Sequence, residues 1–137
     1  MERPKVGLGG IIIKEGKILL AKRKGKFGGG TWGTFGGHLE FEESFNECIK
    51  REAREELGID VKIVDFICVS NLIDNEHHYV DLVFLVEIVD GEPVIMEPEK
   101  HEKLGWYDLD NIPNPLFISI KKALESLRNN NKINDSR

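Results

Sequence analysis

The sequence predicts a single mixed α/β domain with one sheet and two main helices. Its length of 137 residues suits one hydrophobic core. Apolar residues recur at helical spacing in residues 44–57 and 116–127, and the segments around them are rich in β-branched residues, as strands are. No internal repeat or linker is visible. We therefore expect residues 1–128 to form the domain and residues 129–137 a polar tail that frays.

The composition is that of a soluble globular protein, with 40% hydrophobic and 31% charged residues. The net charge of −5 argues against non-specific binding to a nucleic acid polymer. No apolar run approaches the ~20 residues of a membrane-spanning helix, and the N-terminus lacks the apolar core of a signal peptide. Cys48 and Cys68 form no CxxC pair, so we expect two reduced thiols in a cytoplasmic protein.

A hairpin is predicted at the N-terminus. Its strands are the apolar runs Val6–Ile13 and Ile18–Ala21, and Gly16 in the turn between them permits positive φ. The glycine-rich segment at residues 25–33 is predicted as a flexible loop. Its glycines either let the backbone approach a ligand closely or simply connect two elements.

The clearest local signals mark a helix at Ser44–Leu57. Ser44 is followed three residues later by Glu47, which is the pattern of a capping box. Gly58 stands where the helix should end in the left-handed conformation. The helix is therefore predicted with both its start and its end.

Two strands and a second helix are predicted after it. We expect Val61–Ile73 to be a broken or bent strand. Tyr79–Val89 is a nearly continuous apolar run, typical of a central strand, although it could also supply an interface between two copies. Residues 90–102 are predicted as a loop and residues 103–113 as a short strand followed by a turn. Leu116–Leu127 is the second amphipathic helix.

Three carboxylates, Glu52, Glu55 and Glu56, crowd the C-terminal half of the first helix. With Phe45 at zero and ~100° per residue, the apolar residues point near ~40°. Glu56 falls at ~20° and Glu52 at ~340°, inside the apolar sector, and Glu55 lies on its flank at ~280°. A purely solvated run of charges would lie on the opposite side of the helix.

Two explanations of this placement are open. The carboxylates could belong to a salt-bridged helix end, with Arg51 as a nearby partner. Alternatively, they could converge on Mg²⁺ or Mn²⁺, which take oxygen ligands and keep positions for water and phosphate oxygens. Helical geometry alone does not choose between them.

The spacing of these residues resembles the Nudix box, which reads G, five residues, E, seven residues, R-E-aliphatic/small-x-E-E-x-G-aliphatic. Every position of the box is matched, by Gly37, Glu43, Arg51, Glu52, Ala53, Glu55, Glu56, Gly58 and Ile59. The resemblance extends from Val6 to about Leu127. It implies the Nudix fold, an α+β domain built as an α/β/α sandwich around a mixed sheet.

The resemblance also implies hydrolysis of a nucleoside diphosphate linked to another moiety, with Mg²⁺ or Mn²⁺ as the cofactor. The metal ligands it implies are Glu52, Glu55, Glu56 and the carbonyl of Gly36. Arg51 and Glu43 look like a supporting pair that orients these carboxylates.

Within the family, the segments LLAKRKG, GGHLEFEES and MEPEKHEKLGWYDLDNIP are similar to the MutT-related nucleoside triphosphate pyrophosphohydrolases, which sanitise the nucleotide pool. Phe35 and Glu42 depart from that branch, where proline and glycine are usual. ADP-ribose, dinucleoside polyphosphates and nucleotide sugars stay open as substrates. A non-catalytic nucleotide-sensing module is disfavoured, because such a module is expected to have lost box carboxylates. A homodimer is expected by analogy.

In the implied reaction, a carboxylate must accept a proton from the attacking water. Glu52 is the first candidate, because the family often uses that box position. Glu97 or Glu99, in the glutamate-rich late loop, is the second candidate, and simple solvation of that loop is the alternative.

Further contacts with the substrate are expected near the glycine-rich segment. Arg23 ends the second predicted strand and suits phosphate oxygens, although it could also be solvated. Phe35 could stack on a base, whereas Trp106 and Phe117 are expected more often in the core. The remaining expected contacts are Gly37 and His38, which lie beside the metal loop.

Overall fold

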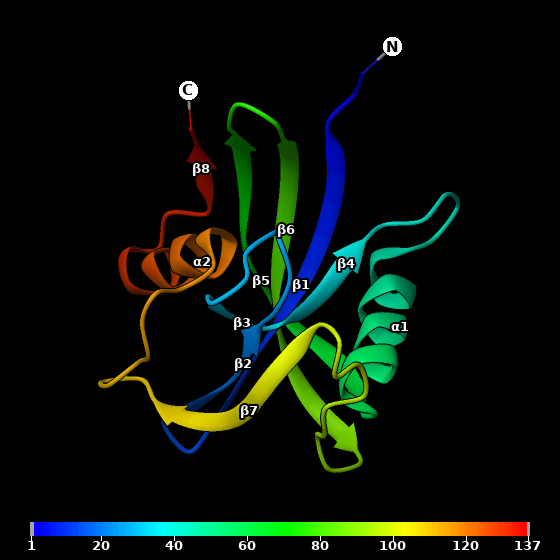
Figure 1. Cartoon of the computed structure of the whole chain (residues 1–137), viewed down its shortest axis with the longest axis vertical. Helices are drawn as coiled ribbons and strands as arrows, with labels where there is room; N and C mark the ends of the chain where they lie inside the picture. Colours follow the sequence, from blue (N-terminus) through cyan, green and yellow to red (C-terminus); the bar gives the residue numbers. More distant parts are fainter. Residues whose placement is uncertain (1, 137) are drawn as a thin grey trace.

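The computed structural model describes residues 2–136 as a mixed sheet flanked by two helices (Figure 1). The strands are β1 (Lys5–Lys14), β2 (Lys17–Arg23), β3 (Trp32–Gly33), β4 (Phe35–His38), β5 (Asp60–Ile73), β6 (His78–Asp90), β7 (His101–Asp108) and β8 (Ile133–Asp135). The helices are α1 (Phe45–Leu57) and α2 (Ile118–Asn129). The strand order is β3-β2-β1-β6-β5-β8, with β4 also paired to β1 and β7 to β2.

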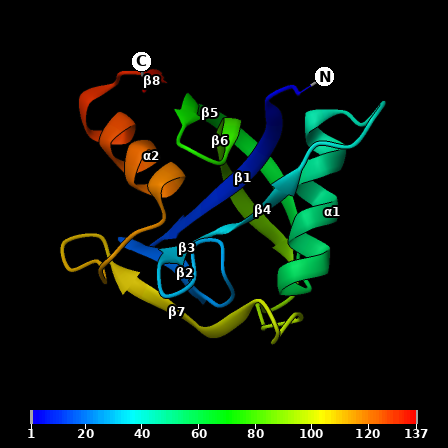
Figure 2. The same cartoon turned by 45° about the horizontal axis from the view of Figure 1, so that its top comes forward.

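The two helices cover opposite faces of the sheet (Figure 2). The apolar side chains of α1 pack in one core with those of β1, β4, β5 and β6. The apolar side chains of α2 pack in a second core that includes residues of β1, β2, β5 and β6. This three-layer arrangement confirms the predicted α/β/α sandwich around a mixed sheet.

The predicted hairpin is confirmed and has a two-residue turn. Glu15 and Gly16 both have positive φ, at 54° and 77°, and Lys14 pairs with Lys17 across the turn. Positive φ at both turn residues matches the right-handed twist of the strands on either side.

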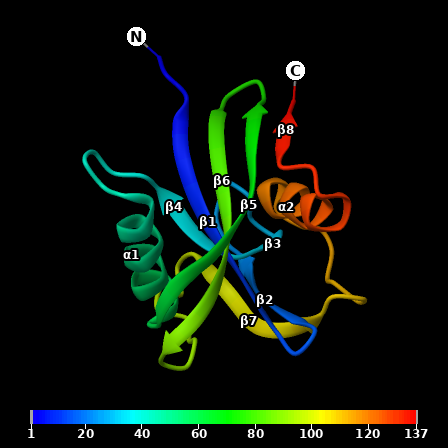
Figure 3. The ribbon, with the colours of Figure 1, turned by 180° about the vertical axis from the view of Figure 1, so that it is seen from behind.

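The predictions for β5 and β6 are also confirmed. β5 is one long strand whose pairing shifts between Ile63 and Asp65 and between Phe66 and Cys68, and such bulges bend a strand. β6 lies between β1, which runs parallel to it, and β5, which runs antiparallel to it (Figure 3). Because both of its edges are paired from Tyr79 to Val86, β6 is a central strand.

The glycine-rich region contains more strand than the sequence predicted. Trp32–Gly33, at the end of the expected loop, pairs with β2, and Phe35–His38 pairs with β1. A Cβ at Gly36 would collide with the carbonyl oxygen of Leu8. Glycine here therefore allows two strands to approach closely. Because glycine is also common in turns and loops, the sequence alone did not indicate this role.

The C-terminal region differs from prediction in two places. Helix α2 begins at Ile118 instead of Leu116, because Phe117 donates its backbone N–H to the carbonyl of Trp32 before the helix starts. The tail expected to fray instead forms β8, parallel to β5. The Asn134 amide donates hydrogen bonds to the hydroxyls of Ser70 and Ser126. Both serines are buried, so these bonds give their hydroxyls a polar partner. Residue 137 lies outside the described residues.

Within residues 2–136, no helix is both long enough and apolar enough to cross a membrane. Cys48 and Cys68 are both buried and unpaired, which agrees with the expectation of two free thiols.

Helix α1 has the ends that its sequence predicts. The Ser44 hydroxyl accepts a hydrogen bond from the Glu47 backbone N–H, and the Glu47 carboxylate accepts one from the Ser44 backbone N–H, at 3.0 and 2.8 Å. At the other end, Gly58 has φ 67° and donates its N–H to the carbonyl of Arg54. Both ends of the helix that carries the box carboxylates are therefore fixed locally.

We predict that Ser44→Ala destabilises the protein by about 1 kcal/mol, because a backbone N–H of the first turn loses its acceptor. Urea unfolding measures the change. The matched variant Ser44→Asp keeps an acceptor at the same position and should stay within a few tenths of a kcal/mol of the wild type. Equal losses in the two variants would contradict the capping role.

Candidate active site

Helix α1 places two carboxylates in its buried face. Glu52 and Glu56 are only 9% and 6% exposed, and they share that face with Cys48, Ile49 and Ala53. This is the placement that helical spacing predicts. Burying two like charges one turn apart is costly, so their surroundings decide which protonation states the site adopts.

The carboxyl group of Glu56 lies close to a backbone N–H, an imidazole and the carboxylate of Glu52. Its Oε2 accepts a hydrogen bond of 2.9 Å from the backbone N–H of Gly36, and its Oε1 lies 3.5 Å from Nε2 of His101. Burial is the main cause that raises the pKa of Glu56 to about 9, and burial also lowers the pKa of His101. Both shifts favour the neutral forms, so the two side chains are not an ion pair. Glu56 is thus a buried carboxyl group that favours its neutral form.

Glu52 occupies space that a glycine leaves open. Its Oε1 accepts a hydrogen bond of 2.7 Å from Arg51, and a Cβ at Gly37 would collide with its carboxylate. The absence of a side chain at residue 37 is therefore a packing requirement of Glu52. This gives a physical reason for the glycine that begins the box.

Arg51 and Glu43 form the supporting pair that the resemblance implies. Two nitrogens of Arg51 donate to the two carboxylate oxygens of Glu43, at 2.7 and 3.0 Å, and one of them also donates to the carbonyl of His38 at 3.1 Å. The hydrogen bonds from Arg51 lower the pKa of Glu43 to about 2. The paired guanidinium holds the loop before α1 against the helix and reaches Glu52 at the same time.

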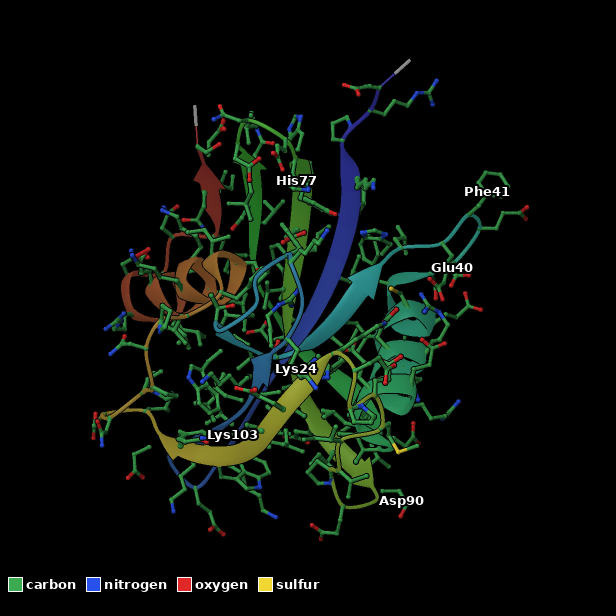
Figure 4. All side chains as sticks on the ribbon, viewed as in Figure 1. Lys24, Glu40, Phe41, His77, Asp90 and Lys103 are labelled. Atoms are coloured by element: carbon green, nitrogen blue, oxygen red, sulfur yellow. The ribbon has the colours of Figure 1, made fainter. Side chains whose placement is uncertain are left out.

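Glu55 lies at the rim of this cluster. Its side chain is 54% exposed, and its Oε2 lies 3.4 Å from Arg51. Its flanking position agrees with the helical spacing. In the loop between β4 and α1, Phe41 extends into solvent, whereas Oε1 of Glu40 lies 3.4 Å from Arg51 (Figure 4).

Glu97 reaches the site from the loop before β7. Backbone hydrogen bonds join this loop to the end of α1, from Val94 to the carbonyl of Leu57 and from Met96 to that of Glu56. Glu97 is close enough to help raise the pKa of Glu56, and its Oε1 is buried without a hydrogen-bond partner. Glu99, the other candidate in this loop, has an exposed side chain.

The chemistry of these groups fits a hard divalent cation. Among residues 2–136, no three His, Cys, Asp or Glu side chains already converge in a metal-binding arrangement. However, Oε1 of Glu97 is buried without a hydrogen-bond partner, although its Oε2 lies 3.4 Å from Nζ of Lys100, and the carboxyl group of Glu56 is also buried. Oxygen donors of this kind are the ligands that Mg²⁺ and Mn²⁺ prefer.

A pocket of about 620 Å³ adjoins the carboxylates through Gly36 and Gly37. It lies between the sheet residues of β1, β4 and β6, the glycine-rich loop, and the start of α2. The guanidinium of Arg23 lies 4.1 Å from the ring centre of Phe117, and its Nε is buried without a hydrogen-bond partner. Burial lowers the pKa of Arg23. The volume is within the range of small-molecule sites.

The expected substrate residues are only partly brought together. Arg23, Gly37 and His38 line the pocket. Phe35 also borders it, but its ring is 3% exposed and packs over Gly10, so it belongs mainly to the core and the expectation that it stacks on a base is not supported. Phe117, expected more often in the core, faces the pocket instead.

The pocket residues that the sequence did not reveal include Phe27, Tyr79 and Asp81. Phe27 lies within the glycine-rich loop, and its ring stacks on that of Tyr79 with centres 5.8 Å apart. Alternation along β6 was a usable signal, because Tyr79 and Asp81 are two residues apart and share one face of the strand. The apolar character of the strand concealed it.

Comparisons with known proteins agree with the fold and the box. The NUDIX domain model matches residues 2–127. The crystal structure of a MutT NUDIX hydrolase from Burkholderia pseudomallei is 42% identical, covers 90% of this chain and 98% of that one, and superposes with a TM-score of 0.87. An ADP-ribose pyrophosphatase of Methanocaldococcus jannaschii is 32% identical over 127 residues, which are 91% of this chain and 74% of that protein.

A longer relative is also similar. The NAD-capped RNA hydrolase NudC of Stutzerimonas stutzeri is 32% identical over 118 residues, which are 85% of this chain but 42% of NudC. The chain thus spans less than half of that protein. A match over nearly the whole chain, the complete box and the shared fold together show that this protein belongs to the Nudix hydrolase family.

Proposed function

We propose that the protein is a divalent-metal-dependent pyrophosphohydrolase of nucleoside triphosphates or related nucleoside diphosphate derivatives. Water attacks phosphorus within a pyrophosphate bridge, the bridging P–O bond breaks, and a triphosphate gives a monophosphate and pyrophosphate. One observation carries the proposal: the carboxyl groups of Glu52 and Glu56 are buried one turn apart on α1, and Gly36 and Gly37, which lie against them, also line a pocket of about 620 Å³. Such reactions depend on positioning and on neutralising phosphate charge.

The residues proposed to hold Mg²⁺ or Mn²⁺ are Glu52, Glu55, Glu56 and the carbonyl of Gly36. When bound, such an ion neutralises phosphate oxygens and lowers the pKa of a bound water. Arg51, fixed by its two hydrogen bonds to Glu43, orients Glu52. Orientation of this kind typically changes metal affinity or activity by ~10–100-fold.

Arg23 is proposed to bind phosphate from the pocket side. Its Nε is an unused donor, and its guanidinium carbon lies 4.1 Å from the ring centre of Phe117. A guanidinium presents donors in a planar fork that suits phosphate oxygens. Positive charge would then meet the phosphates from two sides, from Arg23 directly and from a cation held by α1.

Two carboxylates can take the proton from the attacking water. Glu52 remains the first candidate and is held by Arg51 at 2.7 Å. Glu97 is the second, because its buried Oε1 has an unused lone pair. The exposed position of Glu99 removes the reason to prefer it.

Homodimer formation stays a prediction by analogy, and a cytoplasmic location stays a prediction from the two unpaired cysteines. Light scattering on the purified chain measures the first. ADP-ribose and NAD-capped RNA enter as alternative substrates because two relatives are named for them.

Turnover against a nucleotide panel tests the proposed function. We expect Mg²⁺-dependent hydrolysis of at least one nucleoside triphosphate, with release of pyrophosphate and monophosphate, and no hydrolysis in excess EDTA. The panel includes ADP-ribose, a dinucleoside polyphosphate, a nucleotide sugar and NAD-capped RNA. Products resolved by ion-exchange chromatography identify the bond that is cut. Tight nucleotide binding without cleavage of any compound would favour a sensing module instead.

We predict that Glu56→Gln lowers kcat by roughly 100-fold or more without unfolding the protein. The raised pKa of about 9 means that ionisation of Glu56 favours the unfolded chain. The free energy of unfolding of the wild type in EDTA should therefore fall as the pH rises from 4.5, the ordinary pKa of a glutamate, toward 9. The variant should lose less over the same range. Urea unfolding at several pH values measures this.

Two controls accompany that variant. Mg²⁺ should raise the melting temperature of the wild type but not of Glu56→Gln. Glu125→Gln, which alters a partly exposed carboxylate on α2, should leave activity and both stability profiles unchanged. Full activity in Glu56→Gln would remove Glu56 from the metal site.

A pair of substitutions separates the two candidate bases. We expect Glu52→Gln to lower kcat by ~100-fold or more and to remove the acidic limb of the kcat profile, and Glu97→Gln to cost less than ~10-fold. Glu92→Gln, an exposed change in the same loop as Glu97, is the control. The reverse ranking would assign the proton to Glu97.

A further inference from the structure

A carboxylate that the box does not include lies inside the pocket. Asp81 is on β6, directly opposite Gly7 of the parallel strand β1. A Cβ at Gly7 would lie 2.5 Å from Oδ1 of Asp81. The glycine therefore leaves the space that the Asp81 carboxylate fills.

Asp81 is left without a hydrogen-bonded partner in the described residues. Burial raises its pKa to about 6, and the charge of Arg23 opposes that shift only in part. Arg23 and Asp81 form no ion pair with each other within residues 2–136, although both line the pocket and each influences the other's pKa. A structural pair would close to hydrogen-bonding distance. Instead, the carboxylate of Asp81 and Arg23, whose Nε has no hydrogen-bond partner, both line the same pocket.

The walls around these groups are flat and aromatic. The ring of Phe27 lies 5.8 Å from that of Tyr79 and 5.6 Å from that of Phe117, and Arg23 covers Phe117. Aromatic rings and a guanidinium plane bind a flat heteroaromatic ring by stacking. A ring held in this way presents its polar edge to the polar side chains that line the pocket, Asp81 among them.

The chemistry of a carboxylate limits which edge it can read. An ionised carboxylate has two acceptor oxygens and no donor. Guanine offers two neighbouring donors, the ring N1–H and the 2-amino group. Adenine and cytosine place an acceptor nitrogen beside their single amino group, and that nitrogen would face a second carboxylate oxygen. A buried acceptor left without a donor costs binding energy, so the edge with two donors is favoured.

We infer that Asp81 selects the base of the substrate, and that the pocket takes a guanine-type base whose two neighbouring N–H donors bind the Asp81 carboxylate. The inference rests on the proposed function, because it names the nucleotide class that the same site hydrolyses. It makes Asp81 a specificity-determining residue that acts on the base of the nucleotide.

A ligand series tests the inference on the unaltered protein. Calorimetry measures the binding of GMP, IMP, 1-methyl-GMP and AMP, which are chemically of the same type as the proposed monophosphate product. We expect GMP to bind at least about tenfold more tightly than the other three, since IMP lacks the amino donor and 1-methyl-GMP lacks the ring donor. Equal affinities, tighter AMP binding or no binding of any of the four would overturn it.

The matching change in the protein is Asp81→Asn, which replaces one acceptor oxygen with a donor. The ratio of kcat/KM for GTP over ITP should fall by about tenfold or more, mainly through KM, because base binding is shared by the ground and transition states. Asp90→Asn makes the same change at the other end of β6, far from the pocket residue His77, which directly precedes the strand, and should keep the wild-type ratio (Figure 4). An unchanged ratio in a folded Asp81→Asn protein would overturn the inference.

The two proposals fail in different ways. Turnover of nucleotides with no preference between guanine and other bases keeps the proposed function and rejects the role of Asp81. Selective GMP binding that depends on Asp81, without hydrolysis of any nucleotide, rejects the proposed function and keeps the base assignment. Thermal melting of each variant shows that it is folded, and the ligand series needs no variant at all.

Discussion

The burial of Glu52 and Glu56 on the core side of α1 is the constraint on which the site depends. Carboxylates in this position oppose folding when no cation is bound, and the raised pKa of Glu56 reports that cost. The rest of α1 offsets it with a capping box, a left-handed glycine end and a fully buried apolar stripe. The caps and the buried apolar side chains therefore stabilise the helix, and the buried carboxylates of the site destabilise it.

Strand β4 connects this helix to the substrate pocket. The N–H of Gly36 donates to Glu56, and the missing side chain of Gly37 makes room for Glu52. The same two glycines line the pocket that contains Arg23 and Asp81. One short strand therefore sets the distance between the proposed metal end and the proposed base end of a nucleotide. A side chain at either glycine would disturb both ends together.

Features that depend on neighbouring residues could be predicted from the sequence. The limits of α1, its buried glutamates and the turn at Glu15 and Gly16 follow from periodicity, capping and positive φ, all of which act within a few residues. The pairing of Arg51 with Glu43 was expected from the family motif, and the structure places two hydrogen bonds between them. The hydrogen-bonded residues Glu43 and Arg51 are only 8 positions apart in the chain.

What the sequence by itself determined is the helix, its carboxylates and the family; the pocket was decided only by the tertiary structure. Phe27, Asp81 and Phe117 come from a loop, a central strand and the start of α2, so no local spacing relates them. The same reason explains β8, which forms because Asn134 meets two buried hydroxyls contributed by β5 and α2. Contacts between distant segments depend on sheet order and register, and a single sequence does not state either of them.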